Sequence, residues 1–164
     1  MIKSTRYQLS FVNATEPNSV CRDVFDFFRL HAPIRLAALS HLHVILVFTY
    51  DSIALGEDEP THQPVEQLAS LRAIPNLILI LIRPGDANET AVAWQIAVET
   101  KDCPVLLVLT RQAVPTLDRE RFASAQGVRH DAYVLSDCSD GTPQLILIVS
   151  GSEVALIVAA VEQL

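Results

Sequence analysis

The sequence lacks any cluster or stripe of basic residues. Its 164 residues include 12 lysines and arginines against 19 aspartates and glutamates, so the formal net charge is -7. A protein that binds nucleic acid through the phosphate backbone needs concentrated positive charge on one surface. The sequence therefore predicts that nucleic acid is not a partner.

Cysteine is scarce and has no paired arrangement. Cys21, Cys103 and Cys138 are far apart, and none belongs to a CxxC pair. An odd number of scattered cysteines is typical of reduced thiols in the cytoplasm and not of a disulfide framework or a zinc site. The sequence also lacks a Walker loop and a GxGxxG turn. We expect a cytoplasmic protein without a metal site of its own.

Long apolar runs are absent as well. No run approaches the about 20 residues that a bilayer-spanning helix requires. The N-terminal stretch "MIKSTRYQLSFVNATEPNS" has no apolar segment of the kind that signal peptides carry. We therefore expect neither secretion nor contact with a membrane.

What the sequence does contain is enough apolar material for one domain with a substantial core. Half of the residues are hydrophobic and only 19% are charged, a balance that argues against disorder. Apolar runs typical of buried strands alternate with segments of helical spacing. The runs are "HVILVFT", "NLILILI" and "PVLLVLT", followed by "AYVLSD" and "QLILIVS"; the helical segments are "PIRLAALS", "PVEQLASLRAI", "ANETAVAWQIAVET" and "EVALIVAAVEQL".

This alternation predicts an α/β fold, a doubly wound and mostly parallel sheet covered by helices on both faces. Local signals support the helix positions. Asp86 is suited to cap the helix that follows it, with Glu89 three residues later as in a capping box. Ser152 is suited to cap the last helix.

Polar loops follow the three main strands, and ligands of such sheets gather beyond the carboxyl ends of the strands. Asp58 and His62, in the first loop, can hydrogen-bond a polyol and move protons. Arg111, after the third strand, can bind a phosphate through its planar fork of donors. A phosphorylated sugar fits this combination. The alternatives are solvated acids, a structural histidine, and arginines (Arg83 and Arg111) that pair with nearby carboxylates.

Several long motifs together resemble the transketolase family, in order and at similar intervals. They are "DSIALGEDEPTHQPVEQLASLRAIPNL", "RPGDANETAVAW", "LTRQAVP" and "SGSEVAL". The resemblance covers residues 32–164. It implies the thiamine-diphosphate-binding fold, with residues 32–136 as the pyrimidine-binding domain and residues 137–164 as a linker plus the first strand and helix of a truncated C-terminal domain. Residues 1–31 form a divergent segment.

The resemblance also implies an activity and its partners. Transketolases move a two-carbon ketol unit between sugar phosphates of the pentose phosphate pathway, using thiamine diphosphate and a divalent metal. Their active site forms between the domains of two subunits. We therefore expect a homodimer, or pairing with another transketolase chain.

Individual site residues follow from the motifs. Asp58 matches the family aspartate that binds a sugar hydroxyl, and His62 matches a histidine that contacts the ketol hydroxyls near the reacting carbons, the catalytic position. Arg111 matches the arginine that binds the acceptor's phosphate. Tyr50 replaces a substrate-binding histidine of the family, and Glu59 replaces a glycine beside the sugar channel, which adds bulk and negative charge.

The family's cofactor-activating glutamate sits in an "REH"-like motif that this sequence does not contain. The cofactor-binding residues therefore stay unassigned, and we expect the chain to be inactive alone. Three interpretations remain open: an inactive transketolase-derived fragment, one half of a split transketolase that works with a separate N-terminal-domain chain, or a non-catalytic dimerisation and interaction module.

Overall fold

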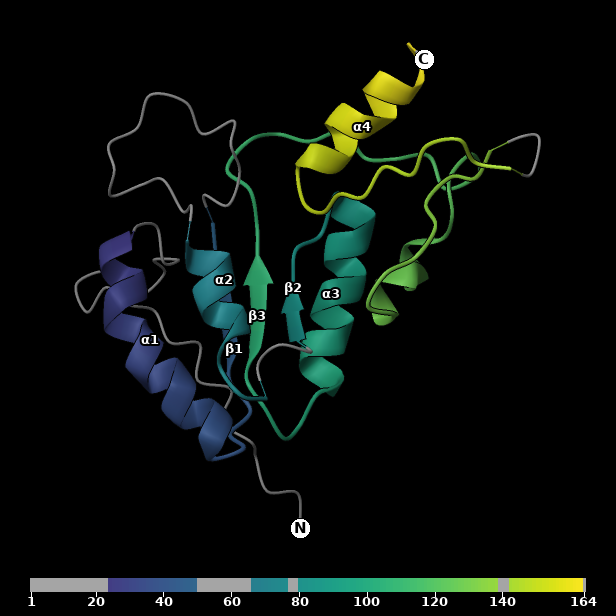
Figure 1. The fold of residues 1–164 in the computed structure, drawn as a ribbon. Helices are drawn as coiled ribbons and strands as arrows, with labels where there is room; N and C mark the ends of the chain where they lie inside the picture. The colour runs from purple at the N-terminus through teal and green to yellow at the C-terminus, as the bar shows by residue number, and fades with distance from the viewer. Residues whose placement is uncertain (1–23, 50–65, 77–79, 139–141, 164) are drawn as a thin grey trace.

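The computed structural model describes residues 24–49, 66–76, 80–138 and 142–163, with side chains from residue 30 onward. From α1 to β3, helices and strands alternate as the sequence predicts (Figure 1). Their bounds are α1 Val24–Leu39, β1 Ile45–Phe48, α2 Gln67–Arg72, β2 Leu81–Ile82, α3 Ala87–Glu99, β3 Val105–Val108, the 3-10 helix η4 Ala125–Arg129, and α4 Glu153–Val161.

The sheet of the described residues has three strands in the order β1-β3-β2, and both pairings are parallel. Ile45 lies opposite Val105 in the first pairing, and Leu81 lies opposite Leu106 in the second. The last strand along the chain therefore occupies the middle of the sheet. All four residues of β3 are buried, which is why this segment reads as an unbroken aliphatic run.

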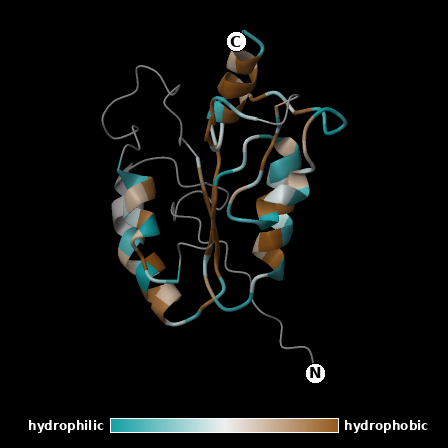
Figure 2. Ribbon diagram, turned by 45° about the vertical axis from the view of Figure 1, so that its right-hand side comes forward, coloured by the Kyte–Doolittle hydropathy of each residue, from teal (hydrophilic) through white to brown (hydrophobic). Residues whose placement is uncertain are grey.

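Helices cover both faces of the sheet, which confirms the doubly wound α/β prediction. Figures 1 and 2 show α1 and α2 on one face and α3 on the other. Parallel strands need long crossover connections, and helices α2 and α3 provide them. The result is a three-layer arrangement with the aliphatic strands in the middle.

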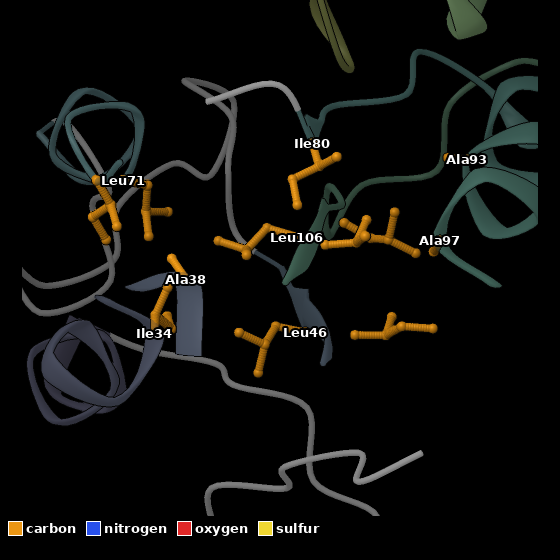
Figure 3. Packing of buried hydrophobic residues seen from close by; sticks show 12 residues of the cluster. Ile34, Ala38, Leu46, Leu71, Ile80, Ala93, Ala97 and Leu106 are labelled. Carbon is orange, nitrogen blue, oxygen red and sulfur yellow. The ribbon is translucent and has the colours of Figure 1, made fainter. Parts of the chain in front are cut away.

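The core lies between these layers (Figure 3). Ile34 of α1 and Leu71 of α2 are each only 2% exposed, and Leu106 of the central strand is fully buried. On the opposite face, Ala93 and Ala97 of α3 are also fully buried. Their spacing of four residues puts both on one side of the helix, and their small side chains let α3 approach the sheet closely.

Two predicted strands are wrong. Residues 132–137 and residues 144–150 contain no strand in the structure. Both segments have residues that favour strands, but a strand also needs a hydrogen-bonded neighbour, and neither pairs with the sheet that the structure describes. Leu145, Ile146 and Ile148 are consequently 63%, 74% and 88% exposed.

Within the described residues, no helix is both long enough and apolar enough to cross a membrane.

Candidate functional site

Two of the three polar loops that the sequence singles out meet at one edge of the sheet. Residues 83–86 follow β2, and residues 109–117 follow β3, the strand beside it. Since the strands are parallel, both loops leave from the carboxyl edge. Figure 1 shows this edge at the arrowhead of β3, below α4. This is the edge where the sequence predicts a ligand site.

The third loop carries most of the predicted site and lies outside the described residues. Tyr50, Asp58, Glu59 and His62 all fall between residues 50 and 65. Their roles in substrate binding, and the catalytic role of His62, stay predictions.

Arg111 is the predicted site residue that the structure does describe. It lies three residues beyond the end of β3, and its side chain is exposed. The Leu109 amide donates to the Phe48 carbonyl at 2.7 Å, so β1 holds the start of the loop. The Thr110 hydroxyl donates to the side-chain oxygen of Gln112 and accepts from the Gln112 amide at 3.4 Å. The backbone at Arg111 and Gln112 thus forms a bend at the carboxyl edge.

Asp86 does more than cap α3. Its Oδ1 accepts from the Glu89 amide at 2.8 Å, which confirms the predicted N-cap. Its Oδ2 accepts from the Leu117 amide at 3.0 Å and from Nη2 of Arg119 at 2.8 Å. The Asp86 side chain is fully buried, and a buried carboxylate of this kind needs such partners to remain in an apolar interior.

Glu89 departs from the predicted capping box. Its Oε2 accepts from the Gly85 amide at 2.8 Å, one residue before the cap. Its Oε1 accepts from the Tyr133 hydroxyl and lies 3.5 Å from Nη2 of Arg119. Asp86, Glu89, Arg119 and Tyr133 thus form one network, which we call the Asp86 network. It ties the start of α3 to Arg119, before η4, and to Tyr133, after it.

The Asp86 network changes the acidity of two of its members. Burial, together with the hydrogen bond to Glu89, raises the pKa of Tyr133 to about 12. Burial lowers the pKa of Arg119, but hydrogen bonds with Tyr133 and Asp86 outweigh this effect, so the pKa is raised above its usual value. Tyr133 therefore remains a neutral donor and Arg119 a cation at physiological pH.

Arg83, the first residue after β2, holds the C-terminal segment against the carboxyl edge. Its Nη1 donates to the carbonyl and hydroxyl oxygens of Ser150 at 3.1 and 3.2 Å. Its Nη2 lies 2.6 Å from Oε2 of Glu153. The Gly151 amide donates back to the Arg83 carbonyl at 3.1 Å. We call these contacts the Arg83 latch. They confirm the alternative in which Arg83 pairs with a carboxylate.

Two glycines make the close approach of α4 possible. A Cβ on Gly85 would lie 2.8 Å from Cγ2 of Val154, and a Cβ on Gly151 would lie 2.7 Å from Nε of Arg83. Gly151 also has φ of +67°, a conformation that favours glycine. Ser152 occupies the N-cap position of α4, but its side chain makes no capping hydrogen bond, so the predicted cap is wrong in this respect.

The described residues offer no ligand set for a divalent metal. No three histidine, cysteine, aspartate or glutamate side chains among them converge on one point. The two buried carboxylates, Asp86 and Glu89, already accept from amides, Arg119 and Tyr133. The described part of the chain therefore does not fit the metal that accompanies a diphosphate cofactor.

The sequence pattern does not predict the contacts of Asn88, Arg119 and Tyr133 at this edge. The Asn88 side-chain amide donates to the Leu117 carbonyl at 3.2 Å. Nothing in the local patterns around Arg119 or Tyr133 indicates that they lie near α3, because their partners are 33 and 44 residues away. The one available signal was the motif "RPGDANE", in which Asp86 and Glu89 looked like helix caps.

Known proteins give this arrangement a family context. The family model described as "Transketolase, pyrimidine binding domain" matches residues 9–116. The transketolase of Bacillus subtilis (strain 168) is 57% identical over 135 residues, which cover 82% of this chain and 20% of that protein. The transketolase of Aquifex aeolicus (strain VF5) is 54% identical over 129 residues, covering 79% and 18%. The chain thus spans about a fifth of the length of these curated relatives.

Solved structures agree in fold. A transketolase mutant from Pichia stipitis, crystallised in complex with fructose 6-phosphate, superposes with a TM-score of 0.74 at 40% identity, covering 83% of this chain and 19% of that one. The transketolase of Campylobacter jejuni superposes with a TM-score of 0.53 at 42% identity, covering 61% and 15%. The three-layer fold, the motif loops at its carboxyl edge and these matches lead to one conclusion: the chain belongs to the transketolase family, and its fold is that of the thiamine-diphosphate-binding proteins.

Proposed function

We propose that this chain supplies the sugar-phosphate-binding part of a transketolase-type site, and that its 164 residues alone do not turn over substrate. The reaction is the thiamine-diphosphate-dependent transfer of a two-carbon ketol unit between sugar phosphates. The supporting observation is the position of Arg111, exposed on a bend at the carboxyl edge, in a chain 57% identical to a transketolase.

In this proposal Arg111 binds the phosphate of the acceptor sugar. An arginine suits this task because its donors match two phosphate oxygens at once. Asp58 and His62 hydrogen-bond the hydroxyls of the sugar, and His62 is the residue nearest the reacting carbons. A phosphorylated sugar bound to the Pichia stipitis relative is consistent with this substrate class.

Tyr50 and Glu59 weaken the binding of phosphorylated substrates. Tyrosine donates a hydrogen bond but does not become a cation, so Tyr50 loses the charge that a histidine can bring to a phosphate. Glu59 adds a negative charge beside a dianionic substrate. The proposed site is therefore a weaker version of the family site.

The proposed lack of turnover follows from the cofactor chemistry. A family-type glutamate would assist ionisation of the thiamine diphosphate ring, and the sequence contains no "REH"-like motif to supply that glutamate. Cofactor and metal would then be held largely by another chain or domain. In the split-enzyme alternative, a separate chain supplies the cofactor and metal sites. In the interaction-module alternative, no partner supplies them and the chain has no catalytic role.

We further propose that residues 137–164 begin a following domain. Leu145 and Ile146 point to opposite faces if the segment is extended, and both are exposed. Strands covered on both faces, as in parallel sheets, have this apolar composition.

A second copy of this chain, or another transketolase chain, is the proposed partner. Residues 1–31 remain the proposed divergent segment, although α1 runs through its limit and the family match begins at residue 9.

A transfer assay tests the proposal. The purified chain, supplied with thiamine diphosphate, magnesium and a ketose phosphate donor with an aldose phosphate acceptor, should give no product above a buffer control. Addition of a separately purified N-terminal domain of a bacterial transketolase then distinguishes the alternatives. Product in the mixture supports a split enzyme, and product from the chain alone would contradict the proposal.

A further inference from the structure

We propose that Asp86 and Asn88 are positioning residues that clamp Leu117 and thereby hold the 109–117 loop, and Arg111 within it, in place at the carboxyl edge. The part concerning Arg111 rests on the proposed function, in which this arginine binds phosphate. The clamp itself does not depend on it.

The clamp grips both backbone polar groups of one residue. The Leu117 amide donates to Oδ2 of Asp86 at 3.0 Å, and the Leu117 carbonyl accepts from Nδ2 of Asn88 at 3.2 Å. The Leu117 side chain is buried, with 8% exposed. Leu117 thus donates one backbone hydrogen bond and accepts another, and its side chain is buried. Together these contacts fix the position and the orientation of its backbone.

Leu117 is the far anchor of the loop that carries Arg111. The near anchor is the bond from the Leu109 amide to the Phe48 carbonyl at 2.7 Å. Between the anchors, Ala113, Pro115 and Thr116 are exposed, whereas Val114 is half-buried. The two anchored ends therefore help to set the conformation of the loop.

The clamp is attached to a rigid element. Asp86 and Asn88 lie at the start of α3, and Ala93 and Ala97 of the same helix are fully buried against the sheet. Asp86 is further fixed by the Glu89 amide and by Arg119. A continuous chain of contacts thus leads from the core through α3 to the loop.

The Asp86 carboxylate is not placed to contact a ligand. Both Asp86 oxygens accept hydrogen bonds inside the protein, and its side chain is fully buried beside Arg119. Its charge is therefore neutralised locally and not presented to a substrate. Asp86 and Asn88 act on binding only through the loop.

Asn88→Asp provides the sharpest test, because it keeps the shape of the side chain but replaces the donor to the Leu117 carbonyl with an acceptor. Thr100→Val is the matched control, since it removes a side-chain hydrogen bond to a backbone carbonyl, that of Ile96, at the other end of α3. Asp86→Asn is the second clamp variant, but loss of charge beside Arg119 can impair folding, so the conclusion rests on Asn88→Asp.

The first measurement is hydrogen exchange of the Leu117 amide, with backbone NMR order parameters for residues 110–116. Asn88→Asp should speed exchange at Leu117 by about 2- to 10-fold, the effect of weakening one hydrogen-bonded contact, and should lower the order parameters of the loop. Thr100→Val should leave both unchanged. Exchange and order parameters equal to those of the wild type in Asn88→Asp would overturn the clamp.

The second measurement follows the Arg111 side-chain Nε–Hε signal during titration with inorganic phosphate. Asn88→Asp should change this signal in the free protein and weaken the phosphate response several-fold, while Thr100→Val matches the wild type. A wild-type signal that does not respond to phosphate would contradict the proposed role of Arg111, whereas the exchange data would still decide the clamp. An Asn88→Asp response equal to that of the wild type would overturn the link from the clamp to Arg111.

Discussion

Arg83 and Glu153 are 70 residues apart in the sequence, yet their side chains meet at 2.6 Å. The arginine directly follows β2 and the glutamate begins α4. Both side chains are mostly buried, with 13% and 19% exposed. This contact joins the last helix to the sheet at the edge where the proposed site lies.

Removal of this ion pair should loosen α4 without unfolding the sheet. Glu153→Gln should lower the free energy of unfolding by up to about 1 kcal/mol, because water still partly screens the pair, and should speed hydrogen exchange in residues 153–161. Glu162→Gln is the control, since the Glu162–Arg121 pair is 53% and 63% exposed. Equal effects of the two changes would show that the Arg83–Glu153 pair stabilises α4 no more than an exposed ion pair does.

The closeness of Gly85 and Val154 predicts a steric effect. Gly85→Ala should lower the free energy of unfolding by about 1–3 kcal/mol, because the new Cβ would lie 2.8 Å from Val154. The double variant Gly85→Ala with Val154→Ala should recover part of this loss. Urea unfolding of the single and double variants measures both. No recovery in the double variant would contradict a direct clash.

Loss of the cation from the Asp86 network should be far more damaging than loss of the phenol. Arg119→Met leaves the buried Asp86 carboxylate without its charged partner and should lower the free energy of unfolding by about 3–5 kcal/mol. Tyr133→Phe removes one hydrogen bond to Glu89 and should cost about 1–2 kcal/mol. Urea unfolding at neutral pH ranks the two, and the reverse order would contradict the network.

Tyr133 should make stability depend on alkaline pH. Its pKa is raised to about 12 in the folded protein, above the value of about 10 in the unfolded chain. The stabilisation is therefore fully present below pH about 10 and is lost as pH rises through about 12. Tyrosinate absorbance should show a late-titrating group that disappears in Tyr133→Phe. An unchanged titration in that variant would assign the late group to another tyrosine.

Reversal of the two departures in the first loop should strengthen phosphate binding. Tyr50→His with Glu59→Gly restores a group that can become a cation and removes a negative charge, so the phosphate affinity should rise about tenfold at mildly acidic pH. Arg111→Gln in the same background should abolish the gain. NMR titration with inorganic phosphate measures both affinities. Equal phosphate affinities of the wild type and the Tyr50→His/Glu59→Gly chain would contradict the roles assigned to Tyr50 and Glu59.

The sequence was sufficient for features that depend on local pattern or on buried aliphatic runs. The segments around Ile45 and Val105 form parallel strands because their aliphatic side chains are buried, and Asp86 caps α3 because its carboxylate reaches the Glu89 amide three residues on. The family followed from long motifs. The signal for each of these features lies within one short segment of the sequence, even where, as for Ile45 and Val105, the segments that pair are far apart.

Features that depend on distant partners were not predictable in this way. "QLILIVS" has the composition of a strand, but strand formation requires a neighbour that the described chain does not provide. The contact of Asp86 with Arg119 and that of Glu89 with Tyr133 arise only when segments 33 and 44 residues apart fold together. Of the predicted site residues, Arg111 alone lies among those that the structure describes.

The order β1-β3-β2 has a consequence for biosynthesis. Each outer strand pairs only with β3 in this sheet, and β3 is the last of the three to be made. While the ribosome is still translating residues before Val105, β1 and β2 have no ladder partner, and their aliphatic side chains stay uncovered. In the described part of the chain, the ladder between β1, β3 and β2 can therefore form only after residues 105–108 have left the exit tunnel.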